Sequence, residues 1–370
     1  MKYKVPYNYL PIEFKDTKNI FQEWKKLIIS TDFTLGAYVQ KFEKQFSKFC
    51  GAKYCISTNN GTDALILALK SLNIGYGDEV ITVPNSFYAT TGSIVAVGAK
   101  PIFVDCDDRY QIDVNLIESK ITKKTKAILP VHWAGASPDM KKIMKVAKKH
   151  NLYVIEDACM GIGGKVNNQH PGTFGHVNAF SLHPLKSLNV MGDGGMIVTN
   201  STKIYQWAKK YRNHGMTDRD HNDIWGVNMR MQPLQAIVAM ENLKKLKKVI
   251  NLRNKNAQLM DKLLNSLPSH VVVPKRIKGH IETFSLYMIL VNKRDSLLKH
   301  LISKGIEAKI HYPIPLHKQK AHTRSKYKEE IFPVVENQAK KLITLPMHQF
   351  VKSGQINYMY KCIKDFYKSN

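Results

Sequence analysis

Short apolar segments alternate with helix-like segments between about residue 50 and residue 200, and this alternation limits the possible folds more than any other feature of the chain. The apolar segments predicted as strands are 79–84, 100–105, 126–131, 152–157, 177–182 and 195–200. Apolar residues at helical spacing predict helices over 61–72 and 140–150. Short buried strands that alternate with helices are typical of βαβ units. We therefore predict an α/β fold built on a mostly parallel sheet.

The sequence changes character after Pro233. Residues 234–263 show one long helical pattern, and a strand-like segment at 284–291 precedes a helical pattern at 295–304. This mixture is typical of a smaller α+β domain. We predict two domains, 1–245 and 246–370, with the long helix bridging them.

The composition is that of an ordinary soluble globular protein, with 44% hydrophobic and 23% charged residues. No run of about 18 apolar residues occurs, so we expect no transmembrane helix and no membrane partner. Residues 1–10 lack the apolar core of a signal peptide. The five cysteines are scattered without a C-x-x-C pair, which predicts neither a disulfide framework nor a metal site. Together these features favour a cytoplasmic protein.

The net charge of +27 is the feature of the composition that departs most from that of an ordinary globular protein. The lysines are spread over helical patterns such as 141–149 and 244–248, and they form neither a basic tail nor a basic run interleaved with aromatic residues. We therefore interpret the charge as a solvated surface and expect no nucleic-acid partner. A basic surface would also attract an anionic substrate.

Polar residues follow several predicted strands, and ligand sites in open α/β sheets gather at the carboxyl ends of the strands. Gly61 and Thr62 begin a helix, where backbone N–H groups and a hydroxyl can hold a phosphate or simply cap the helix. Glu156 and Asp157 end a strand. A carboxylate there can hold a cation or a protonated ring nitrogen, or it can be an ordinary strand-ending acid.

A lysine and a glycine-rich loop follow the next strand. Lys186 lies between the strand end at Ser181 and the segment 192–195, whose glycines allow a ligand to approach the backbone. A lysine in such a setting can attack a carbonyl, although most lysines of this chain are expected on the surface. The polar segment 226–230 is either a ligand contact, a contact with another subunit or a surface loop.

These candidate site residues indicate more together than any one of them does alone. A phosphate-binding helix start, an acid at a strand end and a lysine after a later strand are the groups that pyridoxal 5′-phosphate (PLP) binding requires. The acid would keep the pyridine nitrogen protonated, so that the ring acts as an electron sink. Lys186 would hold PLP as a Schiff base and would then move a proton between substrate and cofactor.

Motifs such as VIEDACMG at 154–161 and FSLHPLKSL at 180–188 occur in an order that resembles the DegT/StrS sugar aminotransferase family of fold-type I PLP enzymes. The resemblance runs over nearly the whole chain and implies a large domain with a mostly parallel mixed sheet flanked by helices, plus a smaller C-terminal α+β domain. The matching segments are 33–46, 59–69, 77–90, 98–105, 124–135, 154–161, 180–195, 212–215, 226–230, 311–317 and 345–348.

The resemblance also implies how residues of this chain would hold the cofactor. Lys186 stands at the Schiff-base position, and Asp157 stands at the position of the acid on the pyridine nitrogen. Phe87 stands where an aromatic ring stacks on the cofactor. The residues implied in binding its phosphate are Gly61, Thr62, Ser181 and, from the neighbouring subunit, Asn228.

A phosphate contact from the neighbouring subunit implies a homodimer with shared active sites. The motif that often lines the sugar site in the family contributes His311, Tyr312 and His317. One residue departs from the family pattern. Met160 stands three residues after the ring-nitrogen acid, where the family usually has Gln or His near the phenolic oxygen of the cofactor. A methionine cannot donate a hydrogen bond there.

The implied activity is the transfer of an amino group from an amino acid, most often glutamate, to a keto-sugar that is usually nucleotide-linked, for amino-sugar and surface-polysaccharide biosynthesis. Two alternatives stay open. One is a PLP-dependent dehydration or other non-transaminase reaction on the sugar, and the other is a non-catalytic regulatory homologue. The presence of Lys186, Asp157 and the segment 192–195 favours an active enzyme over a decayed site.

Overall fold

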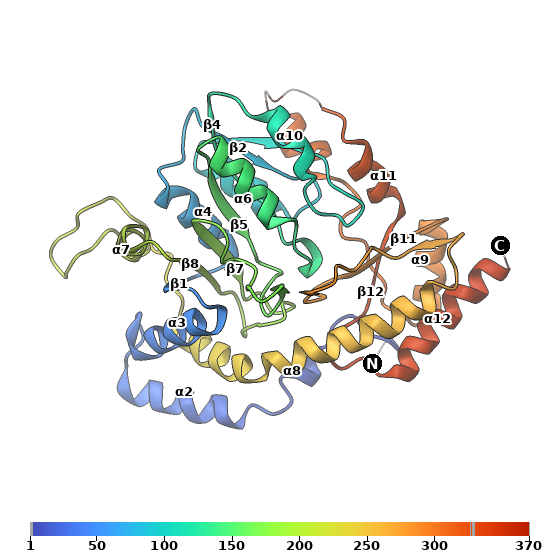
Figure 1. Cartoon of the computed structure of the whole chain (residues 1–370). Helices are drawn as coiled ribbons and strands as arrows, with labels where there is room; N and C mark the ends of the chain where they lie inside the picture. The colour runs from blue at the N-terminus through green and yellow to red at the C-terminus, as the bar shows by residue number, and fades with distance from the viewer. Residues whose placement is uncertain (1–2, 326, 328–329, 370) are drawn as a thin grey trace.

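A seven-stranded sheet forms the centre of the computed structural model, which describes residues 3–325, 327 and 330–369 (Figure 1). The strand order is β1-β8-β7-β5-β4-β2-β3. Strands β3, β2, β4, β5 and β7 are parallel, and β8 runs antiparallel to both of its neighbours. The bounds are β1 (Tyr54–Thr58), β2 (Glu79–Thr82), β3 (Lys100–Phe103), β4 (Thr125–Ile128), β5 (Tyr153–Asp157), β7 (Val177–Ser181) and β8 (Gly195–Thr199). The predicted mostly parallel α/β sheet is confirmed.

Strand β1 is the element of this sheet that the sequence pattern did not reveal. It ends in the hydroxyl residues Ser57 and Thr58 and therefore lacks the apolar run of the other strands. It is buried because it pairs along its whole length with β8, about 140 residues further along the chain. A non-local pairing of this kind leaves no local signature.

Helices cover both faces of the sheet, as the alternation of strand side chains requires. In β8, Ile197 packs into one hydrophobic cluster, while Met196 and Val198 pack into another. The first cluster includes α4 (Gly61–Ser71), α5 (Tyr88–Ala96), α6 (Met140–Lys149) and α7 (Thr202–Tyr211). The second includes α2 (Lys18–Ser30), α3 (Gly36–Cys50) and the first half of α8 (Pro233–Leu264). The sheet therefore lies between two helical layers (Figure 1).

A smaller antiparallel sheet of order β12-β11-β9 lies at the far end of α8 (Figure 1). It packs with helices in a third hydrophobic cluster, which also contains Val5 from the N-terminal segment. The elements of this part are β9 (Val271–Val272), β11 (Tyr287–Val291), α9 (Arg294–Ser303), α11 (Pro333–Lys341), β12 (Leu342–Leu345) and α12 (Ser353–Lys368). Since α8 runs through residue 245 and Val5 bridges to Ile306, the domain division at 245 stays a prediction.

Short elements complete the chain. They are α1 (Leu10–Glu13), α10 (Lys320–Thr323), the paired strands β6 (Lys165–Val166) and β10 (His280–Ile281), and 3-10 turns at 114–116, 118–120, 133–135 and 316–318. Within the described residues, no helix is both long and apolar enough to cross a membrane.

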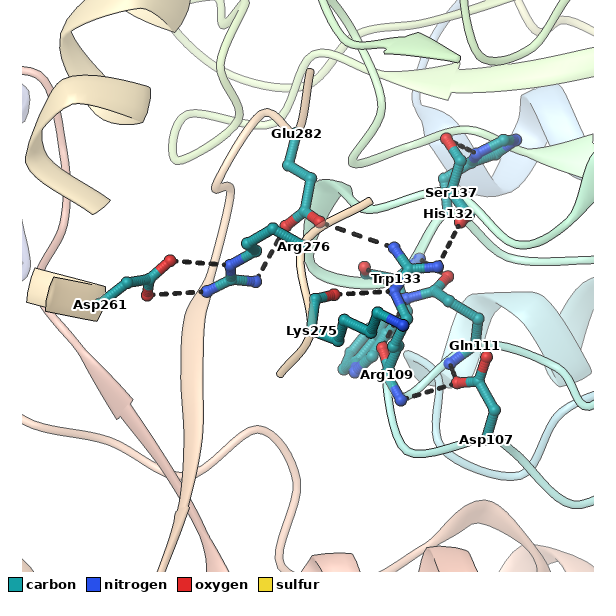
Figure 2. A network of polar contacts seen from close by, with 10 residues as sticks. All are labelled: Asp107, Arg109, Gln111, His132, Trp133, Ser137, Asp261, Lys275, Arg276 and Glu282. Carbon is teal, nitrogen blue, oxygen red and sulfur yellow. Dashed lines mark hydrogen bonds and ion pairs between the residues drawn. The ribbon is translucent and has the colours of Figure 1, made fainter. Parts of the chain in front are cut away.

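A chain of buried polar contacts joins the two parts of the molecule (Figure 2). Asp261 on α8 accepts hydrogen bonds from Arg276 at 3.0 and 3.2 Å, and Arg276 donates at 3.0 Å to Glu282. The other carboxylate oxygen of Glu282 lies 3.6 Å from the guanidinium of Arg109, which belongs to the loop after β3. One acid therefore links an arginine of the central-sheet part to an arginine of the C-terminal part.

We predict that Glu282→Gln lowers the free energy of unfolding by about 3 kcal/mol, because it leaves two largely buried arginines without the charge between them. Urea titration of the purified protein measures the change. The control is Lys26→Met, which removes an exposed ion pair with Glu23 and should leave the free energy of unfolding nearly unchanged, because water and salt screen an exposed pair. Equal costs for the two variants would contradict a special role for Glu282.

Candidate active site

A cavity of about 300 Å³ opens at the carboxyl edge of the central sheet, with walls from both parts of the molecule. Residues of the C-terminal part that line it include Ser285, Leu286 and Lys309. Eight of the residues predicted from the sequence also line it, namely Gly61, Thr62, Phe87, Asp157, Ser181, Lys186, His311 and Tyr312. Residues from five separate segments thus meet in one place.

Asp157 is the last residue of β5, and its carboxylate is held by a short relay of hydroxyl groups. Thr90 on α5 donates to Oδ2 of Asp157 at 2.7 Å, and the Ser86 hydroxyl lies 2.7 Å from that of Thr90. Since Thr90 uses its proton on the carboxylate, Ser86 is the donor to Thr90. The backbone N–H of Cys159 donates to Oδ1 at 3.2 Å. The sequence did not reveal Ser86 or Thr90, because their pairing with Asp157 spans about 70 residues.

Glu156 precedes Asp157 in β5 and has a different role. Its buried carboxylate accepts hydrogen bonds from the backbone N–H groups of Gly172, Phe174 and Gly175, at 2.6–2.7 Å. His132 lies 2.7 Å from the same carboxylate through Nε2. Successive side chains of a strand point to opposite faces, so only Asp157 reaches the cavity. Glu156 instead anchors the loop at 172–175 against the strand.

Lys186 lies in the loop between β7 and β8, which are antiparallel neighbours, so the loop stays at the carboxyl edge of β7. Burial lowers the pKa of Lys186, and the nearby Cys159 and Asp157 partly oppose this shift. A lower pKa increases the fraction of neutral amine, which is the form that attacks a carbonyl.

The backbone around Lys186 is fixed by residues that are distant in sequence. The hydroxyl of Tyr9 donates to the Lys186 carbonyl at 3.2 Å, and Asn189 donates to the same oxygen at 3.3 Å. Arg253 on α8 donates to the hydroxyl oxygen of Tyr9 at 2.9 Å. The N-terminal segment and the long helix therefore hold the loop that presents the lysine.

The start of α4 provides a site for a phosphate. The side chain of Asn60 accepts from the N–H of Asp63 at 2.8 Å, while the N–H groups of Gly61 and Thr62 have no acceptor within the helix. A Cβ at position 61 would lie 2.7 Å from Cβ of Ser181, so only glycine allows β7 to bring the Ser181 hydroxyl beside the helix start. Free N–H groups, the helix dipole and a hydroxyl together favour an anion here.

Aromatic rings form one wall of the cavity. Phe87 precedes α5, and its ring centroid lies 6.1 Å from that of Tyr312 and 5.3 Å from that of Tyr88. Burial raises the pKa of Tyr312 to about 12, so its hydroxyl stays protonated. Burial also lowers the pKa of His311 to about 4, with a smaller effect of Lys309, so its ring is neutral at neutral pH.

These groups fit PLP. Asp157 is an acid for the pyridine nitrogen, Lys186 is an amine for the aldehyde, and the start of α4 with Ser181 is a cradle for the phosphate. Phe87 offers a flat apolar face for the ring. All of them line one cavity, which is what binding of a single cofactor requires.

Two of the predicted residues do not line this cavity. His317 is buried beside Phe332, with Nε2 3.1 Å from a carboxylate oxygen of Glu336. Its expected contact with the sugar stays a prediction that this placement does not support. Asn228 lies in the loop after α7, which projects from the body of the molecule (Figure 1).

Met160 is one of the residues that line the cavity, and its thioether has no proton to donate. Its backbone carbonyl accepts from the hydroxyls of Thr283 at 2.6 Å and Ser285 at 3.0 Å. The backbone of Met160 therefore fastens the C-terminal part to the loop after β5.

The fold and this constellation define a PLP-dependent aminotransferase of fold-type I. The family model described as the DegT/DnrJ/EryC1/StrS aminotransferase family matches residues 15–364, and the chain belongs to this family.

Over most of its length the chain is similar both to proteins named as sugar aminotransferases and to a protein named as a regulator. A UDP-N-acetyl-3-dehydro-alpha-D-glucosamine 3-aminotransferase from Acidithiobacillus ferrooxidans is 37% identical over 90% of this chain and 89% of its own. A pleiotropic regulatory protein from Geobacillus stearothermophilus is 39% identical over 92% of both chains. The crystal structure of S. venezuelae DesV in complex with a ketimine intermediate has a TM-score of 0.94, with 29% identity over 98% of both chains.

We predict that Thr90→Val lowers turnover about tenfold, because Asp157 loses the hydroxyl that orients its carboxylate. Thr90→Ser keeps the hydroxyl and should keep the activity. The pH titration of the visible absorption band of the bound cofactor should shift in the valine variant and stay unchanged in the serine variant. A normal titration and normal turnover for Thr90→Val would contradict the positioning role.

Proposed function

We propose that the chain transfers an amino group from an amino acid, preferably glutamate, to a keto-sugar linked to a nucleotide, as a step of amino-sugar biosynthesis. The observation that carries the proposal is that Lys186 and Asp157 face the same cavity as His311 and Tyr312 of the C-terminal part. The name of the relative from A. ferrooxidans supports a nucleotide-linked acceptor. The net charge of +27 suits an anionic substrate.

PLP supplies an electron sink and a carrier for the amino group. In the proposal, Asp157 keeps the ring nitrogen protonated, and the start of α4 holds the phosphate. Lys186 would hold the cofactor covalently, and its Nζ would carry the proton that is moved during transfer. Its buried position favours both tasks, because burial lowers its pKa and so increases the fraction of neutral amine at a given pH.

The proposal includes a homodimer in which Asn228 reaches the phosphate in the partner subunit. Arg230 has only donors, and its Nε lies 3.0 Å from the side-chain oxygen of Asn228. The amide NH₂ of Asn228 is therefore left to donate outward. Trp225, three residues earlier in the same loop, is 90% exposed in the single chain, which supports contact with another subunit.

Two further parts of the proposal concern the location of the protein and the residues that contact the sugar. All five cysteines are free, which supports a reducing cytoplasm as the location. His311 and Tyr312 are proposed as sugar contacts, because both line the same cavity as the proposed cofactor groups and come from the C-terminal part. A non-catalytic regulatory role is the second candidate function, and it is favoured only by the name of the relative from G. stearothermophilus, a pleiotropic regulatory protein. The intact lysine and acid favour the enzyme.

The visible absorption spectrum of the PLP-loaded protein, before and after glutamate, tests the proposed function. We expect a band from the lysine-bound cofactor that disappears when glutamate donates its amino group. A band that ignores glutamate and every other amino donor would indicate a different PLP reaction. A folded protein without any such band would support the non-catalytic candidate.

Lys186→Ala should lower turnover at least about 10³-fold, because the variant lacks the buried amine proposed as the covalent anchor and proton carrier. Circular dichroism and urea titration serve as controls that the fold survives. Turnover persisting in the purified variant would remove Lys186 from the proposed mechanism.

Sharing of the active site can be tested by mixing two impaired variants. Lys186→Ala and Asn228→Ala should each have little activity alone. In a hybrid dimer, one of the two sites has an intact lysine from one subunit and an intact asparagine from the other. Mixing equal amounts under subunit exchange should therefore restore about a quarter of the wild-type activity. No recovery, with exchange verified by mass spectrometry, would place Asn228 in its own subunit's site or outside any site.

A further inference from the structure

Lys309 lines the cavity from the C-terminal part, and no role in cofactor binding accounts for it. It lies in an extended segment that pairs with Thr344 through backbone hydrogen bonds of 3.0 and 2.8 Å. Residues two apart in an extended segment point to the same side, so Lys309 and His311 both face the cavity. The backbone that carries Lys309 is therefore fixed by pairing.

The ammonium group of Lys309 is held at the edge of the cavity by two neighbours. Its Nζ lies 4.7 Å from the ring centroid of Tyr7 and 3.4 Å from a carboxylate oxygen of Glu307. The other oxygen of Glu307 accepts from the backbone N–H of Tyr7 at 2.8 Å, so the carboxylate itself is fixed. The Lys309 side chain is 41% exposed. An ammonium has three donors, and this arrangement leaves some of them for a ligand.

The charges around the cavity leave Lys309 as the cation that a substrate can use. Among the described residues that line it, the amines are Lys186 and Lys309, and Lys186 is committed to the cofactor. Burial lowers the pKa of both lining histidines, His311 and His183, so they are mostly neutral at neutral pH. The acids on the lining, Asp157 and Asp193, repel an anion.

An amino-acid donor brings a carboxylate into this space. Its amine must reach the cofactor at Lys186, and its α-carboxylate is attached to the carbon that carries the amine. Lys186 and Lys309 both line this one cavity of about 300 Å³, so a small amino acid can meet both amines. The diphosphate of a nucleotide-linked sugar is instead separated from the keto carbon by atoms of the sugar ring.

We propose that Lys309 binds a carboxylate of the amino-acid donor and so selects the donor in the first half of the reaction. The proposal rests on the proposed aminotransferase function and adds a residue that recognises the donor. Glu307 is the positioning residue, because it holds the ammonium at the cavity edge and competes with the incoming carboxylate.

The test compares Lys309→Met with wild type in single-turnover reactions of the PLP-loaded full chain, followed at the cofactor band. We expect the apparent dissociation constant for glutamate to rise about tenfold or more, as for loss of a charged hydrogen bond. Isopropylamine, an amine without a carboxylate, should react equally in both proteins. Alanine distinguishes the two carboxylates of glutamate, because it has only the α-carboxylate. If Lys309→Met weakens the binding of alanine as well as glutamate, Lys309 binds the α-carboxylate. If it weakens the binding of glutamate alone, Lys309 binds the side-chain carboxylate.

A binding measurement without turnover provides the second readout. Isothermal titration with glutarate, a dicarboxylate that lacks the amine, should show weaker binding by Lys309→Met and normal binding by Lys309→Arg. Glu307→Gln keeps an oxygen for the N–H of Tyr7 but removes the competing charge, so glutarate should bind a few-fold more tightly. Lys142→Met, on the exposed surface of α6, controls for net charge.

Glutamate and glutarate binding unchanged in Lys309→Met would overturn the proposal, and so would an equal loss for isopropylamine, which indicates general damage to the site. Failure of the proposed aminotransferase function would give a different result from failure of the Lys309 proposal. In that case the wild-type cofactor band itself does not respond to glutamate, alanine or isopropylamine.

Discussion

The buried carboxylate of Glu282 is the constraint on which the shape of the active site depends. It lies between Arg109 of the central-sheet part and Arg276 of the C-terminal part, and the segment that follows it supplies Ser285 and Leu286 to the cavity wall. Burying three charges is costly unless they are paired. Arg276 and Glu282 pair within the C-terminal part, but Arg109 gains this carboxylate only when the two parts are docked, so the contact favours one relative position of the cavity walls (Figure 2).

The two parts divide the chemistry between them. The central-sheet part supplies the groups that fit the cofactor, namely the acid at the end of β5, the lysine between β7 and β8 and the start of α4. The C-terminal part supplies Lys309, His311 and Tyr312 to the wall of the same cavity, and we propose all three as substrate contacts. Such a division allows substrate recognition to change in the smaller part while the groups that hold PLP stay the same.

The sequence predicted the elements with strong local patterns and the residues in recognisable motifs. The six predicted strands and the long helix α8 are present, and Asp157 and Lys186 face one cavity as expected. The pattern did not reveal Thr90, because its hydroxyl is meaningful only beside Asp157. His317 shares a short motif with His311, yet it packs against Glu336, because a motif does not separate packing residues from residues that face a site.

The N-terminal segment has a further consequence for how the protein is made. Tyr9 donates to the carbonyl of Lys186 and accepts from Arg253, and Val5 bridges to Ile306. A ribosome releases these first residues long before their partners, the last of which lies more than four-fifths of the way along the chain. The earliest residues are therefore among the last to be placed. During synthesis the contacts of Tyr9 and Val5 therefore wait for the C-terminal part, which also supplies Lys309, His311 and Tyr312 to the cavity, so the cavity is completed only late in synthesis.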